Sequence, residues 1–179
     1  MSLFKEFKKN IRHIVAKDLG IKNINATPCL EKIVINVGAG EASKDKEMTS
    51  EIINKLEKIT GQKPQITKAR QAVSGFKIRK GLEVGLSLTL RGKKMYDFFE
   101  RLVDVTFPRI RDFKGVKPEN FDDMANLNIG IKEVVIFPEI NFDDIKKSFG
   151  LNITIVTSTT DKKKAQTLLE NLGMMFAGR

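Results

Sequence analysis

Apolar residues recur along this chain at two spacings, one typical of helices and one typical of strands. Spacings of three and four residues predict helices at about 3–19, 46–60, 96–103 and 165–172. Gly20, Gly61 and Gly173 directly follow three of these segments, where a glycine can end a helix. The helix around 96–103 is expected to end before Pro108, because proline does not continue a helix.

Shorter alternating or apolar runs mark the strands. They predict strands at about 30–37, 65–68, 83–91, 130–137 and 151–158. Two stretches rich in loop-forming residues, about 63–82 and 111–130, are expected to form long loops, the first of them enclosing one short strand. The mixture predicts a single α+β domain over residues 1–179, with a largely antiparallel sheet and helices packed on one face.

The other face of this sheet is expected to be polar in an unusual way. Its side chains are short hydrogen-bonding groups rather than the Lys and Glu of an ordinary solvated surface. With the strands phased by their apolar residues, this face carries Asn36, Ser87, Thr89, Arg91, Asn152 and Thr154. Such side chains can lie close to a ribose or phosphate surface and lose little entropy when they bind. A polar face without any partner is the alternative.

Composition and charge narrow the class of protein. The chain has 179 residues, of which 41% are hydrophobic, and its 32 Lys and Arg against 22 Asp and Glu give a net charge of +10. No apolar run approaches the roughly 20 residues that cross a bilayer. The single Cys29 cannot form an intrachain disulfide, and the charged N-terminal residues do not resemble a signal peptide, so an intracellular protein is expected.

Nearly all the excess charge falls between residues 63 and 94, where Glu83 is the only acidic residue. The basic residues of this window are Lys63, Lys68, Arg70, Lys77, Arg79, Lys80, Arg91, Lys93 and Lys94. Cations at this density suit a phosphate backbone, and Phe76 among them could stack on an unpaired base or anchor the loop internally. RNA is favoured over DNA, because no helix-turn-helix or zinc spacing is present. A solvated basic face without a partner is the alternative.

Candidate catalytic and cofactor motifs are weak. His13 and Cys29 have no partners spaced for a triad or a metal site. In the stretch that starts at Gly38, the third glycine of a dinucleotide loop would fall on Ser43. No catalytic residue, metal or cofactor is therefore predicted. Two alternatives remain open: an RNA-processing or RNA-modifying enzyme, and a membrane-surface protein attached through the helix at 3–19, although a core-packed helix is favoured there.

Several longer motifs resemble one family over most of the chain. They read LEKIVINVGAGEA, GQKPQITKARQAVSGFKIRKG, LTLRGKKMYDFFERL, PRIRDFKG, IKEVVIFPEI and ITIVTSTTDKKKAQTLLENLGMMF. In this order they closely resemble large-subunit ribosomal protein five of the bacterial type. The resemblance implies a non-catalytic protein that binds 5S ribosomal RNA in the central protuberance of the large subunit, in a cytoplasmic or organellar ribosome. Neither a membrane partner nor a homo-oligomer is expected.

The resemblance also implies three groups of site residues. The 5S contact matches Asn36, Gln62 and Thr89, with Phe76 and Arg79 nearby, and the strand phasing adds Arg91. The loop expected to reach transfer RNA in the peptidyl site contains Thr67, Lys68, Ala69, Arg70, Val73, Ser74 and Gly75. The segment expected to meet a small-subunit head protein across an intersubunit bridge contains Arg109, Arg111, Asp112 and Phe113.

The chain departs from this family in one loop. Where the family usually reads F-D-G-R-G-N-Y, residues 121–127 read FDDMANL, without the two glycines and the arginine. No site residue is therefore carried over from 123–127.

Overall fold

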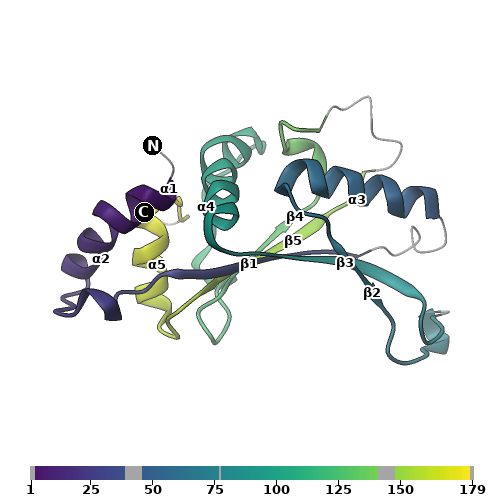
Figure 1. The fold of residues 1–179 in the computed structure, drawn as a ribbon, viewed down its shortest axis with the longest axis horizontal. Helices are drawn as coiled ribbons and strands as arrows, with labels where there is room; N and C mark the ends of the chain where they lie inside the picture. Colours follow the sequence, from purple (N-terminus) through teal and green to yellow (C-terminus); the bar gives the residue numbers. More distant parts are fainter. Residues whose placement is uncertain (1–2, 39–45, 77, 141–147, 178–179) are drawn as a thin grey trace. The chain divides into compact units, whose positions relative to one another are not determined.

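The computed structural model describes residues 3–38, 46–76, 78–140 and 148–177, without the side chains of Lys8, Lys46 and Phe76. Its α-helices are α1 (Leu3–Glu6), α2 (Arg12–Asp18), α3 (Lys46–Thr60), α4 (Gly92–Arg101) and α5 (Lys162–Asn171). Its strands are β1 (Leu30–Gly38), β2 (Gln65–Lys68), β3 (Glu83–Leu90), β4 (Leu127–Ile131) and β5 (Leu151–Thr157). They form one sheet in the order β2-β3-β1-β5-β4 (Figure 1).

The sheet is largely antiparallel, as predicted. Gln65 pairs with Ser87 and Thr67 with Gly85 in the β2–β3 pair. The end of β5 meets the start of β1, since the amide of Ser158 donates to the Cys29 carbonyl at 3.0 Å. The predicted α+β class is confirmed. The contacts divide the chain into two compact units: unit 1 is residues 1–33, 90–129 and 153–179, and unit 2 is residues 34–89 and 130–152.

Unit 2 places α3 over one face of its strands (Figure 1). The helix buries Ile52, Leu56 and Ile59, and the strand residues Ile35 and Leu86 are buried as well. Gly61 ends the helix with φ of +67°, a conformation that glycine adopts without strain. The predicted helix and its end are therefore confirmed. The opposite face of these strands is left without a described helix of this unit.

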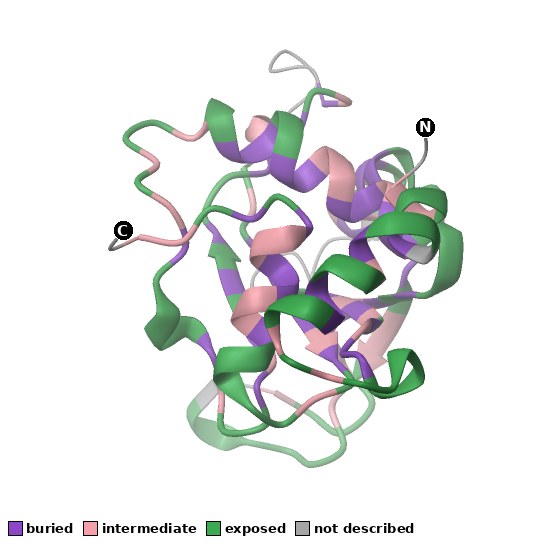
Figure 2. Ribbon diagram, turned by 90° about the vertical axis from the view of Figure 1, so that its left-hand side faces the viewer, coloured by how far each residue is buried: buried purple, intermediate pink, exposed green. Residues whose placement is uncertain are grey.

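Unit 1 contains the N-terminal helical segment, in which a π-helical turn at Phe7–Ile11 joins α1 to α2. Phe7, Ile11 and Val15 are buried, and the rings of Phe4 and Phe7 each lie 5.4 Å from Tyr96 of α4. Figure 2 shows the helices with buried residues toward the interior and exposed residues outward. Most of the apolar stripe of this segment is therefore core, as favoured from the sequence, although Ile14 is exposed. Within the described residues, no helix is both long and apolar enough to cross a membrane.

Two predictions in the second half of the chain are wrong. The strand predicted at 130–137 ends at Ile131, because Val134–Ile136 forms a 3₁₀ turn that buries Val134 and Phe137 three residues apart. The loop predicted at 111–130 contains the start of β4 instead. Asn128 and Gly130, which resemble loop residues, lie on the exposed side of that strand between buried Leu127, Ile129 and Ile131.

The end of β3 and the bounds of the following helix also differ from the prediction. Arg91 lies after β3 and is the residue that precedes α4, so it is not part of the strand face to which it was assigned. The helix predicted around 96–103 begins earlier, at Gly92, and continues through a π-helical turn at Leu102–Thr106. Pro108 then belongs to a 3₁₀ turn at Phe107–Arg109, whose first positions tolerate a proline.

Candidate RNA-binding surface

The uncovered strand face of unit 2 carries two of the predicted contact residues. Asn36 on β1 and Thr89 on β3 are both exposed, between neighbours that are buried. Ser87, two residues before Thr89, is half-buried on the same side of β3. The period of two along each strand places these short polar side chains on the face opposite α3. We call this surface, made by Asn36, Gln65, Thr67, Ser87 and Thr89, the polar face.

Gln62 joins this surface through its side chain. The helix α3 ends at Thr60, and the amide Nε2 of Gln62 donates a hydrogen bond of 3.1 Å to the carbonyl of Thr89. In turn, the hydroxyl of Thr60 donates to the Gln62 carbonyl at 3.0 Å and to the Leu56 carbonyl at 2.7 Å. The turn that carries Gln62 is therefore tied to both the helix and β3. The structure thus brings Gln62 and Thr89 together.

The loop between β2 and β3, residues 69–82, is here called the tip loop. Ala69 and Gly81 are joined by a backbone hydrogen bond of 2.9 Å, and Val73 and Ile78 exchange two, of 2.9 and 3.1 Å. These bonds extend the hairpin beyond the two strands. Thr67 and Lys68 belong to β2, while Ser74 and Gly75 are part of a 3₁₀ turn.

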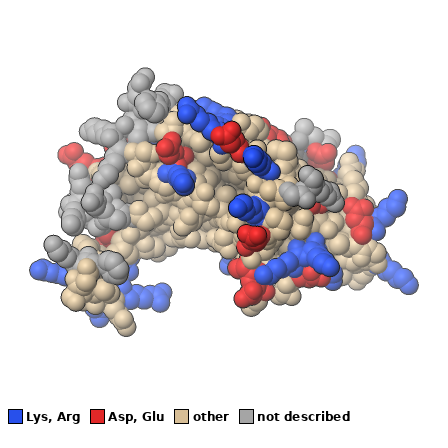
Figure 3. All heavy atoms as spheres, turned by 180° about the vertical axis from the view of Figure 1, so that it is seen from behind, with Lys and Arg blue, Asp and Glu red and all other residues tan. Residues whose placement is uncertain are grey.

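The described cations of the basic window that belong to unit 2 are exposed on this hairpin or next to it. They are Lys63, Lys68, Arg70, Arg79 and Lys80. Lys and Arg atoms project from its end, at the lower left of Figure 3. Lys77 and the side chain of Phe76 lie outside the described residues. The remaining cations of the basic window, Arg91, Lys93 and Lys94, are exposed at the start of α4 in unit 1.

The segment 109–113 belongs to unit 1. Arg109, Arg111 and Asp112 are exposed, and Asp112 has φ of +55°. Phe113 turns inward instead, with its ring stacked on that of Phe107 at 4.8 Å. Three side chains of the predicted bridge segment are thus available to a partner, whereas Phe113 anchors the segment.

Within the part of the chain that the structure describes, no three His, Cys, Asp or Glu side chains gather as a metal site would require. His13 and Cys29, the two candidate catalytic residues, lie in surroundings that do not suggest catalysis. His13 is exposed on α2, and the Cys29 sulfur lies 3.6 Å from the Ser158 hydroxyl oxygen.

Comparison with known proteins covers nearly the whole chain. Residues 23–79 match the family model described as Ribosomal protein L5, and residues 83–176 match the model of the C-terminus of the same ribosomal protein family. The chain belongs to the ribosomal protein L5 family. It is 46% identical over 174 residues, 97% of both chains, to large ribosomal subunit protein uL5 of Anaeromyxobacter sp. (strain Fw109-5). It is 45% identical over 177 residues, 99% of both chains, to the uL5 protein of Prochlorococcus marinus (strain AS9601).

Membership of the ribosomal protein L5 family confirms the predicted resemblance. It identifies the chain as a structural ribosomal protein and not an enzyme, which overturns the alternative of an RNA-processing or RNA-modifying enzyme. A polar face of short side chains beside exposed cations is a surface that suits this class, because RNA presents hydroxyls, base edges and phosphates to a protein.

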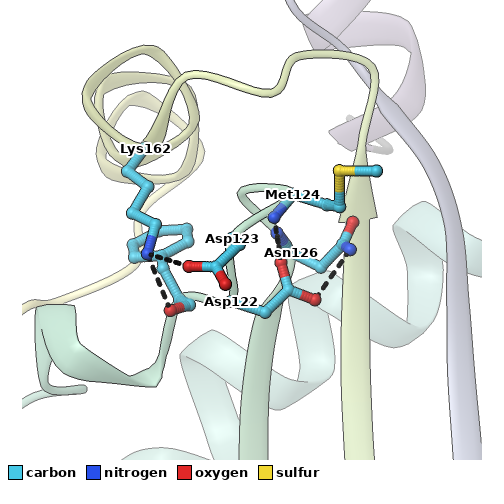
Figure 4. A network of polar contacts seen from close by, with 6 residues as sticks. Asp122, Asp123, Met124, Asn126 and Lys162 are labelled. Carbon is cyan, nitrogen blue, oxygen red and sulfur yellow. Dashed lines mark hydrogen bonds and ion pairs between the residues drawn. The ribbon is translucent and has the colours of Figure 1, made fainter.

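The loop at 121–127, where this L5 protein departs from the family pattern, is closed by Asp122 (Figure 4). Its carboxylate accepts hydrogen bonds from the backbone amides of Met124 and Asn126, at 2.9 and 2.8 Å, and from the Asn126 side chain at 2.9 Å. Burial acts to raise the pKa of Asp122, but these hydrogen bonds and the charge of Lys162 outweigh it and lower that pKa below its ordinary value. Ala125 is buried with φ of +57°, so the turn exists without a glycine there.

Proposed function

We propose that this structural protein of the large ribosomal subunit binds 5S ribosomal RNA with the polar face of unit 2 and helps to hold it in the central protuberance. The observation that carries the proposal is the bond between Gln62 and the Thr89 carbonyl. It positions two of the three predicted contact residues together, and exposed Asn36 lies on β1, next to β3 in the sheet.

Preorganisation is the mechanism we propose. Asn36 and Thr89 are uncharged, project from strands and have few rotamers to lose, so little entropy is lost when they bond to RNA. The exposed cations from Lys63 to Lys94 add an attraction to phosphates that does not depend on sequence, toward 5S RNA and neighbouring large-subunit RNA. Recognition and attraction thus come from different residues, which allows them to be tested separately.

The tip loop supports a second contact, with transfer RNA in the peptidyl site. Lys68 and Arg70 are exposed at its base, and Ser74 and Gly75 form an exposed turn near its end. The paired backbone of Val73 and Ile78 gives this projection a defined shape. A cationic projection of this kind can reach a phosphate backbone outside the main contact.

The segment 109–113 supports a third contact, with a small-subunit head protein across an intersubunit bridge. Arg109, Arg111 and Asp112 offer charges of both signs, and the stacking of Phe113 on Phe107 holds the segment in place. Charged rims of this kind set orientation more than affinity in protein interfaces. The ribosome that these three proposed contacts require is that of a bacterial cytoplasm or of an organelle.

A salt-titrated binding assay tests the proposal. It compares 5S ribosomal RNA with a transfer RNA of similar length, for the unchanged protein and for the double variant Asn36→Ala, Thr89→Ala. We expect selective 5S binding that the double variant loses at every salt concentration, because neither residue is charged. Equal binding of both RNAs, unaffected by the substitutions, would overturn recognition by the polar face.

A further inference from the structure

A hollow of about 290 Å³ opens in unit 2 beside the polar face. Its walls come from the ends of three strands that are neighbours in the sheet. They include Asn36 and Gly38 of β1, Gly130 and Lys132 around the end of β4, and Gly150 and Asn152 around the start of β5. The hollow belongs neither to the tip loop nor to the Gln62–Thr89 pair.

The described residues that line the hollow offer polar groups but no carboxylate. The exposed amide side chains of Asn36 and Asn152 have no hydrogen-bond partner among the described residues. Lys132 is exposed at the same hollow, and none of the described lining residues is a carboxylate. The hollow therefore offers amide donors, amide acceptors and one cation to a bound molecule.

The three glycines that line the hollow differ in whether the structure requires a glycine at their position. A Cβ on Gly150 would lie 2.9 Å from the Ile131 carbonyl oxygen, so packing against the backbone requires glycine there. A Cβ on Gly130 would make an ordinary contact of 3.4 Å with Oδ1 of Asn152. Gly38 is different, because its Cβ would meet no described atom within 4 Å and its φ is not positive. Neither backbone conformation nor packing within the described residues requires glycine at 38.

We propose that this hollow receives the base of one unpaired nucleotide of the bound RNA. The inference rests on the proposed 5S binding and adds a contact that reads a base. The volume is near the lower end of the range for small-molecule sites, about 300 Å³, which suits one planar group. Asparagine amides pair with base edges through two hydrogen bonds, and RNA is read mostly at unpaired bases. Lys132 is placed to meet the phosphate of the same nucleotide.

Gly38→Ala tests the inference directly, because Gly38 lines the hollow and a Cβ at this position would meet no described atom within 4 Å. The experiment measures the affinity of the full chain for 5S ribosomal RNA, together with chemical probing of every unpaired base in the complex. We expect an unchanged urea midpoint and affinity about tenfold weaker, which corresponds to one lost base contact. One base that the unchanged protein protects should become reactive in the complex with Gly38→Ala. Thr160→Ala, a substitution at an exposed residue of unit 1 outside every proposed contact, is the control and should leave both readouts unchanged.

Asn152→Ala gives a second route if Gly38→Ala fails to fold. It enlarges the hollow instead of filling it, and we expect the same base to lose protection. Lys132→Gln should instead lower the salt dependence of binding by about one charge and leave the base protected.

The outcomes separate this inference from the proposed function. If the unchanged protein does not bind 5S RNA selectively, the proposed function fails and the inference fails with it. If it binds selectively, but Gly38→Ala and Asn152→Ala alter neither affinity nor the protection of any base, the hollow is no nucleotide site, while the polar face remains the contact.

Discussion

Gln62 supplies a hydrogen-bond donor to Thr89 at the point where the β2–β3 ladder ends. β2 begins at Gln65, opposite Ser87, and Pro64 before it has no amide hydrogen to donate. The carbonyl of Thr89, two residues beyond Ser87, receives its donor from the Gln62 side chain at 3.1 Å. This bond therefore substitutes for strand pairing and fixes the turn after α3 against the end of β3.

Gln62→Ala is expected to weaken 5S binding about tenfold while it lowers the free energy of unfolding by less than about 1 kcal/mol. The stability effect is small because the bond is exposed to water, which replaces the lost donor. The binding effect is larger because the substitution removes one predicted contact residue together with the bond that holds it beside another, Thr89. Binding at constant salt and urea unfolding measure the two quantities. Asn120→Ala, at an exposed residue of unit 1 outside the polar face, is the control, and equal loss of binding by both variants would contradict a specific role of Gln62.

Salt dependence measures the contribution of the basic window. If about six of its nine cations meet phosphates, the logarithm of the binding constant falls with the logarithm of salt concentration at a slope of roughly −4 to −5. Changing Arg70, Arg79 and Lys80 together to Gln should make that slope shallower by about 2 to 3. Arg109→Gln, an exposed cation outside the window, should leave the slope unchanged. A slope near zero in the unchanged protein would rule out the electrostatic contribution.

Asp122 makes the stability of the 121–127 loop depend on pH. Its pKa is lowered in the folded state, so its charged form stabilises the fold at pH values above the ordinary carboxyl value of 3.8. That contribution is lost as the pH falls through the lowered pKa. Asp122→Asn should therefore reduce the free energy of unfolding by about 1 kcal/mol at pH 7, and by progressively less below about pH 4.

Urea unfolding at several pH values measures this difference. Asp123→Asn is the matched control, because Asp123 is exposed and its carboxylate lies 3.4 Å from Nζ of Lys162, a solvated ion pair that contributes little. A difference between Asp122→Asn and the unchanged protein that stayed constant from about pH 7 to about pH 3 would contradict the assignment.

Replacing Gly85 or Gly38 of unit 2 by Ala is expected to have different effects on the free energy of unfolding. A Cβ on Gly85 would lie 2.7 Å from the Val37 carbonyl oxygen and 3.2 Å from the Thr67 hydroxyl, whereas a Cβ on Gly38 meets no described atom. Gly85→Ala should cost about 1–3 kcal/mol because β3 must move away from its neighbour. Gly38→Ala should change stability by less than about 0.5 kcal/mol. Urea unfolding of both variants under the same conditions measures this difference. Equal midpoints would contradict the prediction, because they would show that the strands move to accept the Gly85→Ala methyl group without loss of stability.

The period of two was the most informative local signal in this chain. In β1 and β3 it predicted most of the buried positions and correctly assigned Asn36 and Thr89 to the polar face, although Gly85 on the polar side of β3 is buried. It works there because alternation in a strand with one covered face is a direct record of burial. The same rule failed for Arg91, whose side chain follows the strand, because the sequence does not mark where pairing stops and α4 begins.

The wrong assignments between 111 and 137 have a different cause. Asn128 and Gly130 are poor strand formers, yet β4 forms because it pairs with β5. The hydroxyl of Thr154 on β5 also donates a hydrogen bond of 2.7 Å to Oδ1 of Asn128 on β4. Val134–Ile136 favours a strand by composition, yet it turns because Val134 and Phe137 are both buried from one side. Partners distant in the chain override local propensity in both segments.

By itself, the sequence determined the fold class, the helices and most strands, the concentration of positive charge and the family, because each depends on local periodicity, composition or an ordered series of motifs. Only the tertiary structure decided that Gln62 bonds to Thr89, that Asp122 closes a loop lacking the usual glycines, and that a hollow opens beside Gly38. These features depend on atoms from separate strands and turns meeting at a few ångströms. Such distances follow from how the elements pack, which no pattern along a single segment contains.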